Sequence, residues 1–284
     1  MLAVLVAVCT AVLIVLALAF ARKTRPTAHV ACRPGAGLFS NLVECIQTTL
    51  CHPALDVECT GWPREIAALV PHMPHAERAA DARVDSLYDC YLMQEPRVFE
   101  SDGFAEVRWR MHRLVVPNAP FAPAPFLLER ARAWWDRNVG PCGTFARSAR
   151  FVVGVHGRAA LHYESATGLA EHTRALCAAA EREMPPGAHL LFTSCNATMV
   201  AAMAARYGER VKWRRPEGAL SQNNEDWGTV IDAETSAGAL VDALLLSMCD
   251  VVVCGSSNVI LYVAALNPTA RIVLAPHLRA VRGK

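Results

Sequence analysis

The sequence predicts an α/β protein whose second half forms a parallel sheet covered by helices on both faces. Short apolar segments alternate with helical segments after residue 150, which is the pattern of parallel strands buried on both faces. Polar or glycine-containing turns follow several of these segments. Roughly 260 residues follow an apolar N-terminal segment, enough for two small domains.

The apolar N-terminal segment predicts a retained membrane anchor at residues 1–22. Residues 2–21 contain no charged side chain, and Thr10 is the single polar one. A helix of about 20 residues spans roughly 30 Å, the thickness of a hydrocarbon core. The segment is longer than the apolar core of a cleaved signal peptide and lacks its basic start. A cleaved signal and a buried helix remain the alternatives.

The net charge of the chain and the basic residues after the anchor indicate its partners and its orientation in the membrane. The formal net charge is only +2, so we expect no nucleic-acid partner. Arg22, Lys23 and Arg25 directly follow the anchor, and the positive-inside rule would leave the folded part in the cytoplasm.

Residues 28–145 are predicted to form the first domain. We expect a strand at 28–32, a turn that contains Gly35 and Gly37, a helix at 40–50 and a strand at 54–59. Residues 62–125 give no clear elements, and a helix follows at 126–138. Gly140 and Pro141 break the chain there and mark the domain boundary.

Residues 148–284 are predicted to form the second domain, which is more regular. The expected strands are 151–155, 189–193, 210–213, 250–254 and 271–275. The expected helices are 168–183, 197–207, 236–249 and 257–266. Residues 214–235 are interpreted as a long polar loop.

Candidate binding residues follow the ends of these strands, where open parallel sheets bind ligands. His156 and Arg158 follow the first strand, Thr193 ends the second, and residues 255–258 open a helix after the fourth. A guanidinium such as that of Arg158 matches phosphate geometry with two parallel hydrogen bonds. The Gly-Ser-Ser turn before the helix suits an anion, although an ordinary serine N-cap is the alternative.

Several motifs are absent from the sequence. It contains no Asp-x-Asp pair, no Walker-type phosphate loop and no G-x-S-x-G elbow. We therefore expect no metal and no cofactor, with arginine and helix N-termini stabilising a departing diphosphate.

The eleven cysteines show no C-x-x-C pair. Cys249 and Cys254 are interpreted as small core residues. Some of the remaining cysteines are candidates for disulfide bonds whose connectivity the sequence does not reveal; these are Cys32, Cys45, Cys51, Cys59, Cys90 and Cys142.

Two segments resemble a known family. Residues 152–158, VVGVHGR, resemble the G-V-H-x-R strand and turn of the α1,6-fucosyltransferase group, which includes bacterial nodulation enzymes and core N-glycan enzymes. Residues 239–259, ALVDALLLSMCDVVVCGSSNV, are similar to a later motif of the same group. The resemblance covers roughly residues 150–275.

The resemblance implies two Rossmann-like domains of the GT-B kind, with the first on the acceptor side and the second holding the donor. It implies inverting, metal-independent transfer of fucose from GDP-fucose to a glycan or protein acceptor. It also favours a secretory lumen, Golgi or ER, although the basic residues favour the cytoplasmic side. The predicted donor-binding residues are His156, Arg158, Thr193, Asp242, Gly255, Ser256, Ser257 and Asn258, with Gly35 and Gly37 of the first turn.

The general base has two candidates. In several relatives a glutamate follows the family arginine, and here Glu164 lies close to that place, with His162 as its rival. An ordinary helix start at Glu164 is the alternative. Together with Arg158, these two residues are the predicted catalytic set.

The chain also departs from the family pattern. Ala159 stands where many relatives carry a second basic residue, and Ser194 and Cys195 stand where the core N-glycan enzymes carry paired acids. A different sugar nucleotide therefore remains an alternative donor. A catalytically inactive, membrane-tethered relative with a binding or structural role remains an alternative function.

Overall fold

A computed structural model describes residues 27–32, 38–51, 56–71, 97–101, 104–108, 122–140, 151–157, 166–214, 232–255, 257–267 and 270–275, together with Thr10 and Val12. No helix within these ranges is long and apolar enough to cross a membrane. The anchor predicted at residues 1–22 lies outside them, apart from Thr10 and Val12, and therefore stays a prediction.

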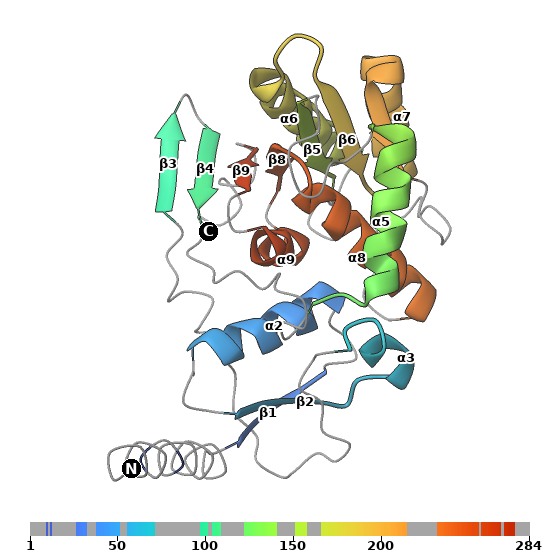
Figure 1. The fold of residues 1–284 in the computed structure, drawn as a ribbon. Helices are drawn as coiled ribbons and strands as arrows, with labels where there is room; N and C mark the ends of the chain where they lie inside the picture. Colours follow the sequence, from blue (N-terminus) through green and yellow to red (C-terminus); the bar gives the residue numbers. More distant parts are fainter. Residues whose placement is uncertain are drawn as a thin grey trace, which may run out of the picture.

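The larger sheet has seven strands in the order β3-β4-β9-β8-β5-β6-β7. Its five parallel strands are β9 (Arg271–Leu274), β8 (Val251–Cys254), β5 (Val152–His156), β6 (His189–Thr193) and β7 (Val211–Trp213). These strands confirm the predicted parallel sheet (Figure 1).

Two antiparallel strands, which were not predicted from the sequence, extend the sheet beyond its parallel part. β3 (Arg97–Ser101) and β4 (Phe104–Arg108) form a hairpin, and β4 pairs with β9. Their sequences, RVFES and FAEVR, mix apolar and charged residues. That pattern is typical of strands near a sheet edge, so a search for continuous apolar strands misses them.

Helices cover both faces of the sheet. α6 (Ala166–Glu183) and α7 (Ala197–Tyr207) pack on one face, with the 3₁₀ turn η2 (Gly208–Arg210) after α7, while α8 (Ala233–Ser247) and α9 (Asn258–Leu266) pack on the other. Side chains of β5 alternate accordingly: Val153 and Val155 join the cluster with α6 and α7, whereas Val152 joins the one with α8 and α9. This alternation confirms the doubly covered sheet.

The first part of the chain forms a small βαβ unit. β1 (Thr27–Ala31) pairs in parallel with β2 (Asp56–Thr60), and α2 (Leu38–Cys51) connects them. The short helix α3 (Arg64–Ala67) follows β2. The strands and helix predicted for residues 28–59 are thus confirmed, with bounds shifted by one or two residues.

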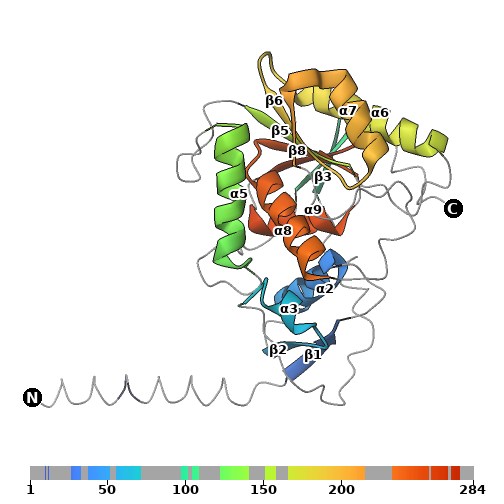
Figure 2. The ribbon, with the colours of Figure 1, turned by 90° about the vertical axis from the view of Figure 1, so that its right-hand side faces the viewer.

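The βαβ unit and the larger sheet share one continuous core. α2 packs on α9, where the rings of Phe39 and Tyr262 lie 5.4 Å apart. In both ribbon views α8 and α9 lie between the seven-stranded sheet and the βαβ unit (Figure 1, Figure 2).

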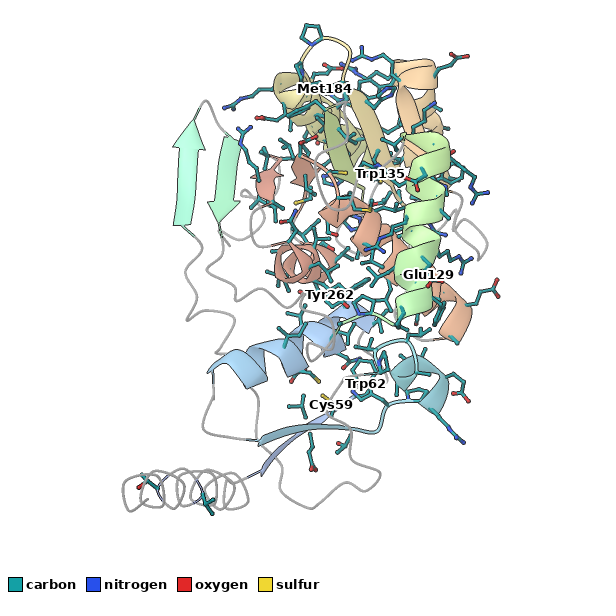
Figure 3. All side chains as sticks on the ribbon, viewed as in Figure 1. Cys59, Trp62, Glu129, Trp135, Met184 and Tyr262 are labelled. Atoms are coloured by element: carbon teal, nitrogen blue, oxygen red, sulfur yellow. The ribbon has the colours of Figure 1, made fainter. Side chains whose placement is uncertain are left out.

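The helix α5 (Pro125–Asn138) packs on α8 and buries Trp135, which Figure 3 labels. β3, β4 and α5 all precede residue 145 and yet belong with the larger sheet. The predicted domain boundary near that residue therefore does not coincide with a change of sheet.

Candidate functional site

Three predicted donor-binding residues meet at the carboxyl edge of the larger sheet. His156 ends β5, Thr193 ends β6, and Ser257 directly precedes α9. The His156 Nδ1 atom lies 3.1 Å from Thr193 Oγ1, and its Nε2 atom lies 3.3 Å from Ser257 Oγ. Thr193 and Ser257 are buried, and His156 is half-buried. The imidazole thus joins two strands to the first turn of a helix, and we call these three residues the rim cluster.

Ser257 links the rim cluster to the start of α9. The Val259 N–H donates to Ser257 Oγ at 3.3 Å, so Ser257 is the N-cap of α9. A hydroxyl group can donate one hydrogen bond and accept two, so Ser257 can cap the helix and contact His156 at the same time. The N-cap interpretation of this serine is confirmed. Anion binding at the same helix start remains a prediction.

Gly157, directly after β5, packs closely against the core. Its N–H donates to the Thr193 carbonyl at 2.9 Å. A Cβ atom at this position would lie 2.7 Å from the Phe192 ring and 2.8 Å from Met199 Cε. Both neighbours are fully buried, so only glycine lets the backbone pass this close to the core.

We expect Gly157→Ala to destabilise the fold by about 1–3 kcal/mol, because the added methyl overpacks this contact. Urea unfolding monitored by tryptophan fluorescence measures the effect. Gly168→Ala in α6 is the control, since alanine inside a helix is neutral or stabilising. An unchanged unfolding midpoint for Gly157→Ala would contradict the packing argument.

Asp242 contacts Arg214 rather than the rim cluster in the described contacts. Arg214 directly follows β7; its Nε donates to Asp242 Oδ1 and its Nη2 donates to the Gly238 carbonyl, both at 2.7 Å. A Cβ atom on Gly238 would lie 3.3 Å from Nη2, so this glycine leaves room for the guanidinium. Burial raises the pKa of the Asp242 carboxyl, and the positive charge of Arg214 opposes that shift. The donor-binding role of Asp242 stays a prediction.

Sequence reasoning missed Arg214 as a site residue because it was grouped with the polar loop that follows it. The signal that identified His156 also applies to Arg214: a polar residue stands at the carboxyl end of a parallel strand.

Asn196 belongs to the one Asn-x-Ser/Thr sequon of the chain and caps α7. Its Oδ1 accepts from the Met199 N–H at 3.0 Å, and its own N–H donates to Ser194 Oγ at 3.1 Å. The residue is 3% exposed. A buried amide that caps a helix is not available to carry a glycan.

We therefore expect Asn196 to be unmodified when the chain is produced in a glycosylating cell. Glycopeptide mass spectrometry checks this directly. A glycan on Asn196 in folded, functional protein would contradict the placement of α7 beside the rim.

The remaining predicted site residues divide into two groups. Gly255 is buried after β8, and Asn258 begins α9, so both flank the rim cluster. The described ranges do not include the others, which are Gly35, Gly37, Arg158, His162, Glu164 and Ser256. Nor do they contain three His, Cys, Asp or Glu side chains grouped to hold a metal ion; metal independence stays a prediction.

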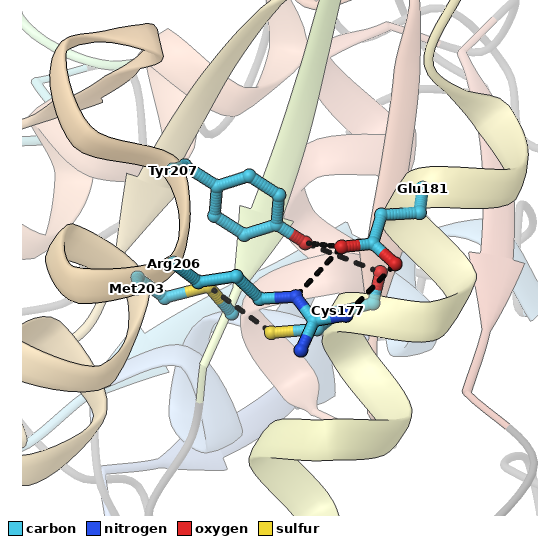
Figure 4. A network of polar contacts seen from close by, with 5 residues as sticks. All are labelled: Cys177, Glu181, Met203, Arg206 and Tyr207. Carbon is cyan, nitrogen blue, oxygen red and sulfur yellow. Dashed lines mark hydrogen bonds and ion pairs between the residues drawn. The ribbon is translucent and has the colours of Figure 1, made fainter.

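A second polar network lies at the opposite end of the sheet. Arg206 donates to both oxygens of Glu181 at 2.6 and 2.9 Å, and the Tyr207 hydroxyl donates to Glu181 at 3.1 Å (Figure 4). The Arg206 guanidinium holds the pKa of the Glu181 carboxyl below its usual value. The network borders a hollow of about 320 Å³. Since α6 and α7 both end here, just before β6 and β7 begin, this hollow is not part of the rim.

Neither a protein-family model nor the sequence of a curated protein matches this chain. Solved structures do match it in three dimensions. The structure of selenomethionine-labelled fucosyltransferase NodZ from Bradyrhizobium superposes with a TM-score of 0.51 and 13% sequence identity, over 88% of this chain and 94% of NodZ. NodZ α-1,6-fucosyltransferase soaked with GDP-fucose superposes with a TM-score of 0.50, at the same identity and coverage.

The chain has a NodZ-like fold. The likeness to NodZ covers 88% of the chain and thus extends beyond residues 150–275, where the sequence resembles the fucosyltransferases. At 13% identity the likeness to NodZ establishes the fold and leaves activity and substrates to be argued from the site.

Proposed function

We propose that this chain is a glycosyltransferase that binds a nucleotide sugar, GDP-fucose first among the candidates, and transfers the sugar to a hydroxyl group of a glycan or protein. The observation that carries the proposal is the rim cluster, His156, Thr193 and Ser257, at the carboxyl edge of a sheet in a NodZ-like fold. A NodZ crystal of this fold was soaked with GDP-fucose.

The rim offers the chemistry that a diphosphate needs. The first turn of α9 presents backbone N–H groups and the positive end of the helix dipole. Ser257 fixes this turn through its N-cap bond and its contact with His156. Arg158 comes directly after the constrained Gly157. In the proposal its guanidinium binds two phosphate oxygens at once.

The transfer is proposed to be inverting and metal-independent. The bond between the sugar C1 and the β-phosphate oxygen breaks, and its electron pair leaves with the nucleoside diphosphate. The acceptor oxygen forms the new bond to C1 from the opposite face, while a base takes its proton. Arg158 and the α9 N-terminus stabilise the charge that develops on the leaving group.

The βαβ unit is proposed to contribute to the acceptor side, as one of two Rossmann-like domains of a GT-B fold. Phe39, in the first turn of α2, packs against Tyr262 of α9. Gly35 and Gly37 lie just before α2 in the sequence. The start of α2 therefore contacts α9, the helix whose first turn lies at the rim cluster.

A panel of sugar nucleotides tests the proposed function. The full-length chain is titrated with GDP-fucose, GDP-mannose and UDP-linked sugars, and release of the nucleoside diphosphate is measured with and without EDTA. We expect saturable binding and turnover of GDP-fucose that EDTA does not abolish. Binding without turnover would support the inactive, tethered relative instead. If no sugar nucleotide binds, the proposal is wrong.

Between the two candidate bases, we expect Glu164→Gln to lower transfer by about 10²–10⁴-fold while donor affinity is kept, since a base acts on the acceptor proton during attack. His162→Gln, assayed at saturating donor, is the matched comparison. If His162→Gln alone loses turnover, the two roles are exchanged. If both variants transfer normally, neither residue is the base.

Residues 1–22 are proposed to tether the chain as a single-pass anchor, with the folded part in the secretory lumen. Arg22, Lys23 and Arg25 favour the opposite orientation. Protease protection of the folded part in sealed microsomes supports the lumenal arrangement, and digestion without detergent contradicts it.

A further inference from the structure

Two buried cysteine side chains of the βαβ unit contact each other. Cys45 projects from α2 and Cys59 from β2, and they are 1% and 0% exposed. Both are free thiols, and the Cys45 side chain lies within hydrogen-bonding reach of Cys59. Figure 3 shows the labelled Cys59 between α2 and the β1–β2 pair. Packing thus brings together two thiols that come from different elements.

We propose that Cys45 and Cys59 form a disulfide bond that links α2 to β2. A disulfide needs Cβ atoms roughly 3.5–4.5 Å apart, so only cysteines whose side chains already meet can form one without backbone movement. Both side chains belong to the same buried cluster, so the bond would replace a thiol contact already inside the core.

The other cysteines considered are less suitable partners for Cys45 or Cys59. The Cys177 thiol donates to the Met203 sulfur at 3.6 Å (Figure 4). The Cys249 and Cys254 thiols point to the carbonyls of Leu245 and Val273. Cys32 lies near the pair, but it is only half-buried and follows β1.

The three neighbouring thiols do not form a metal site either. Within the described ranges no group of three potential ligands, Cys32, Cys45 and Cys59 included, is arranged to hold a metal ion. Shared ligation of a metal ion therefore does not account for the contact.

The chemistry requires an oxidant that carries a disulfide, such as a protein or glutathione disulfide. One cysteine thiolate attacks it to give a mixed disulfide, and the second thiolate then displaces the oxidant's remaining sulfur. The two cysteines lose two protons and two electrons, and the oxidant is reduced to two thiols. The hydrogen bond from Cys59 and burial raise the pKa of the Cys45 thiol in the folded chain. The bond therefore forms during folding, before the thiols are buried.

The first test maps the bond in the wild-type chain. The full-length protein is reduced, unfolded, refolded in a glutathione redox buffer, alkylated under denaturing conditions without reductant, and digested for mass spectrometry. We expect one peptide pair joined through Cys45 and Cys59, with Cys249 and Cys254 both alkylated as internal controls. The proposal is overturned if Cys45 and Cys59 are both alkylated, or if Cys32 is joined to either of them.

The second test measures how much the disulfide bond raises the thermal stability of the fold. Closing a loop of about 15 residues should raise Tm by roughly 6–12 °C in a protein of this size. We expect reductant to lower the wild-type Tm by that amount and to leave the Tm of Cys45→Ser/Cys59→Ser unchanged. The matched control is Cys249→Ser/Cys254→Ser, which also replaces two buried thiols and should keep the response to reductant. A wild-type Tm that reductant does not alter contradicts the proposal, and neither test depends on sugar transfer.

Discussion

Arg158→Ala is expected to lower the turnover of sugar transfer by roughly three orders of magnitude. In the proposed site the guanidinium neutralises the departing diphosphate next to the α9 N-terminus. Loss of one partner from a buried charge pair costs about 3–5 kcal/mol, and each 1.4 kcal/mol is about a tenfold change in rate. The rate of nucleoside diphosphate formation at saturating donor and acceptor measures the effect.

Two companion variants separate this role from a general loss of positive charge. Arg158→Lys should recover turnover only in part, because an ammonium group cannot form two parallel hydrogen bonds. Arg206→Ala should leave turnover unchanged, since Arg206 binds Glu181 at the other end of the sheet. Near-normal turnover of correctly folded Arg158→Ala would show that another group stabilises the diphosphate.

Arg214→Ala is expected to lower the free energy of unfolding by about 3 kcal/mol, because it leaves the Asp242 carboxylate buried without its partner. The side chains of Arg214 and Asp242 are only 7% and 19% exposed, and their closest atoms are 2.7 Å apart. The residual exposure of Asp242 places the expected effect at the low end of the range for buried pairs. Urea unfolding monitored by circular dichroism measures it.

Arg206→Ala is the matched control for this stability prediction. Arg206 also contacts a carboxylate, at 2.6 Å, but its side chain is 49% exposed and that of Glu181 is 44% exposed. Solvent screens such a pair, so the expected loss is at most about 1 kcal/mol. The double variant Arg214→Leu/Asp242→Leu should be less destabilised than Arg214→Ala, because no charge is left buried. Equal losses for Arg214→Ala and Arg206→Ala would contradict the importance of burial.

Most elements of the larger sheet were predictable because a single physical signal determines them. β6 and α7 have the predicted bounds, since an apolar strand ends at Thr193 and an alanine-rich helix ends before Gly208. The β3–β4 hairpin carries charged residues within short strands. Only its pairing with β9 shows that this segment belongs to the sheet, and such long-range pairing leaves no local pattern.

The residues of the rim cluster were predictable from the sequence, whereas contacts that depend on packing were not. Strand order was not needed to expect His156, Thr193 and Ser257 at one edge, because the carboxyl ends of parallel strands share it. The contact between Arg214 and Asp242, 28 residues apart, depends on how α8 docks beside β7. The close approach of Gly157 to Phe192 likewise depends on packing that the sequence does not display.

A crystal structure of the full-length chain with bound GDP-fucose tests the central claim most directly. We expect the diphosphate at the carboxyl edge of the larger sheet, against the first turn of α9 and within hydrogen-bonding reach of Arg158, with His156 still between Thr193 and Ser257. A nucleotide bound in the hollow beside Glu181 and Arg206, or on the βαβ unit alone, would contradict the account.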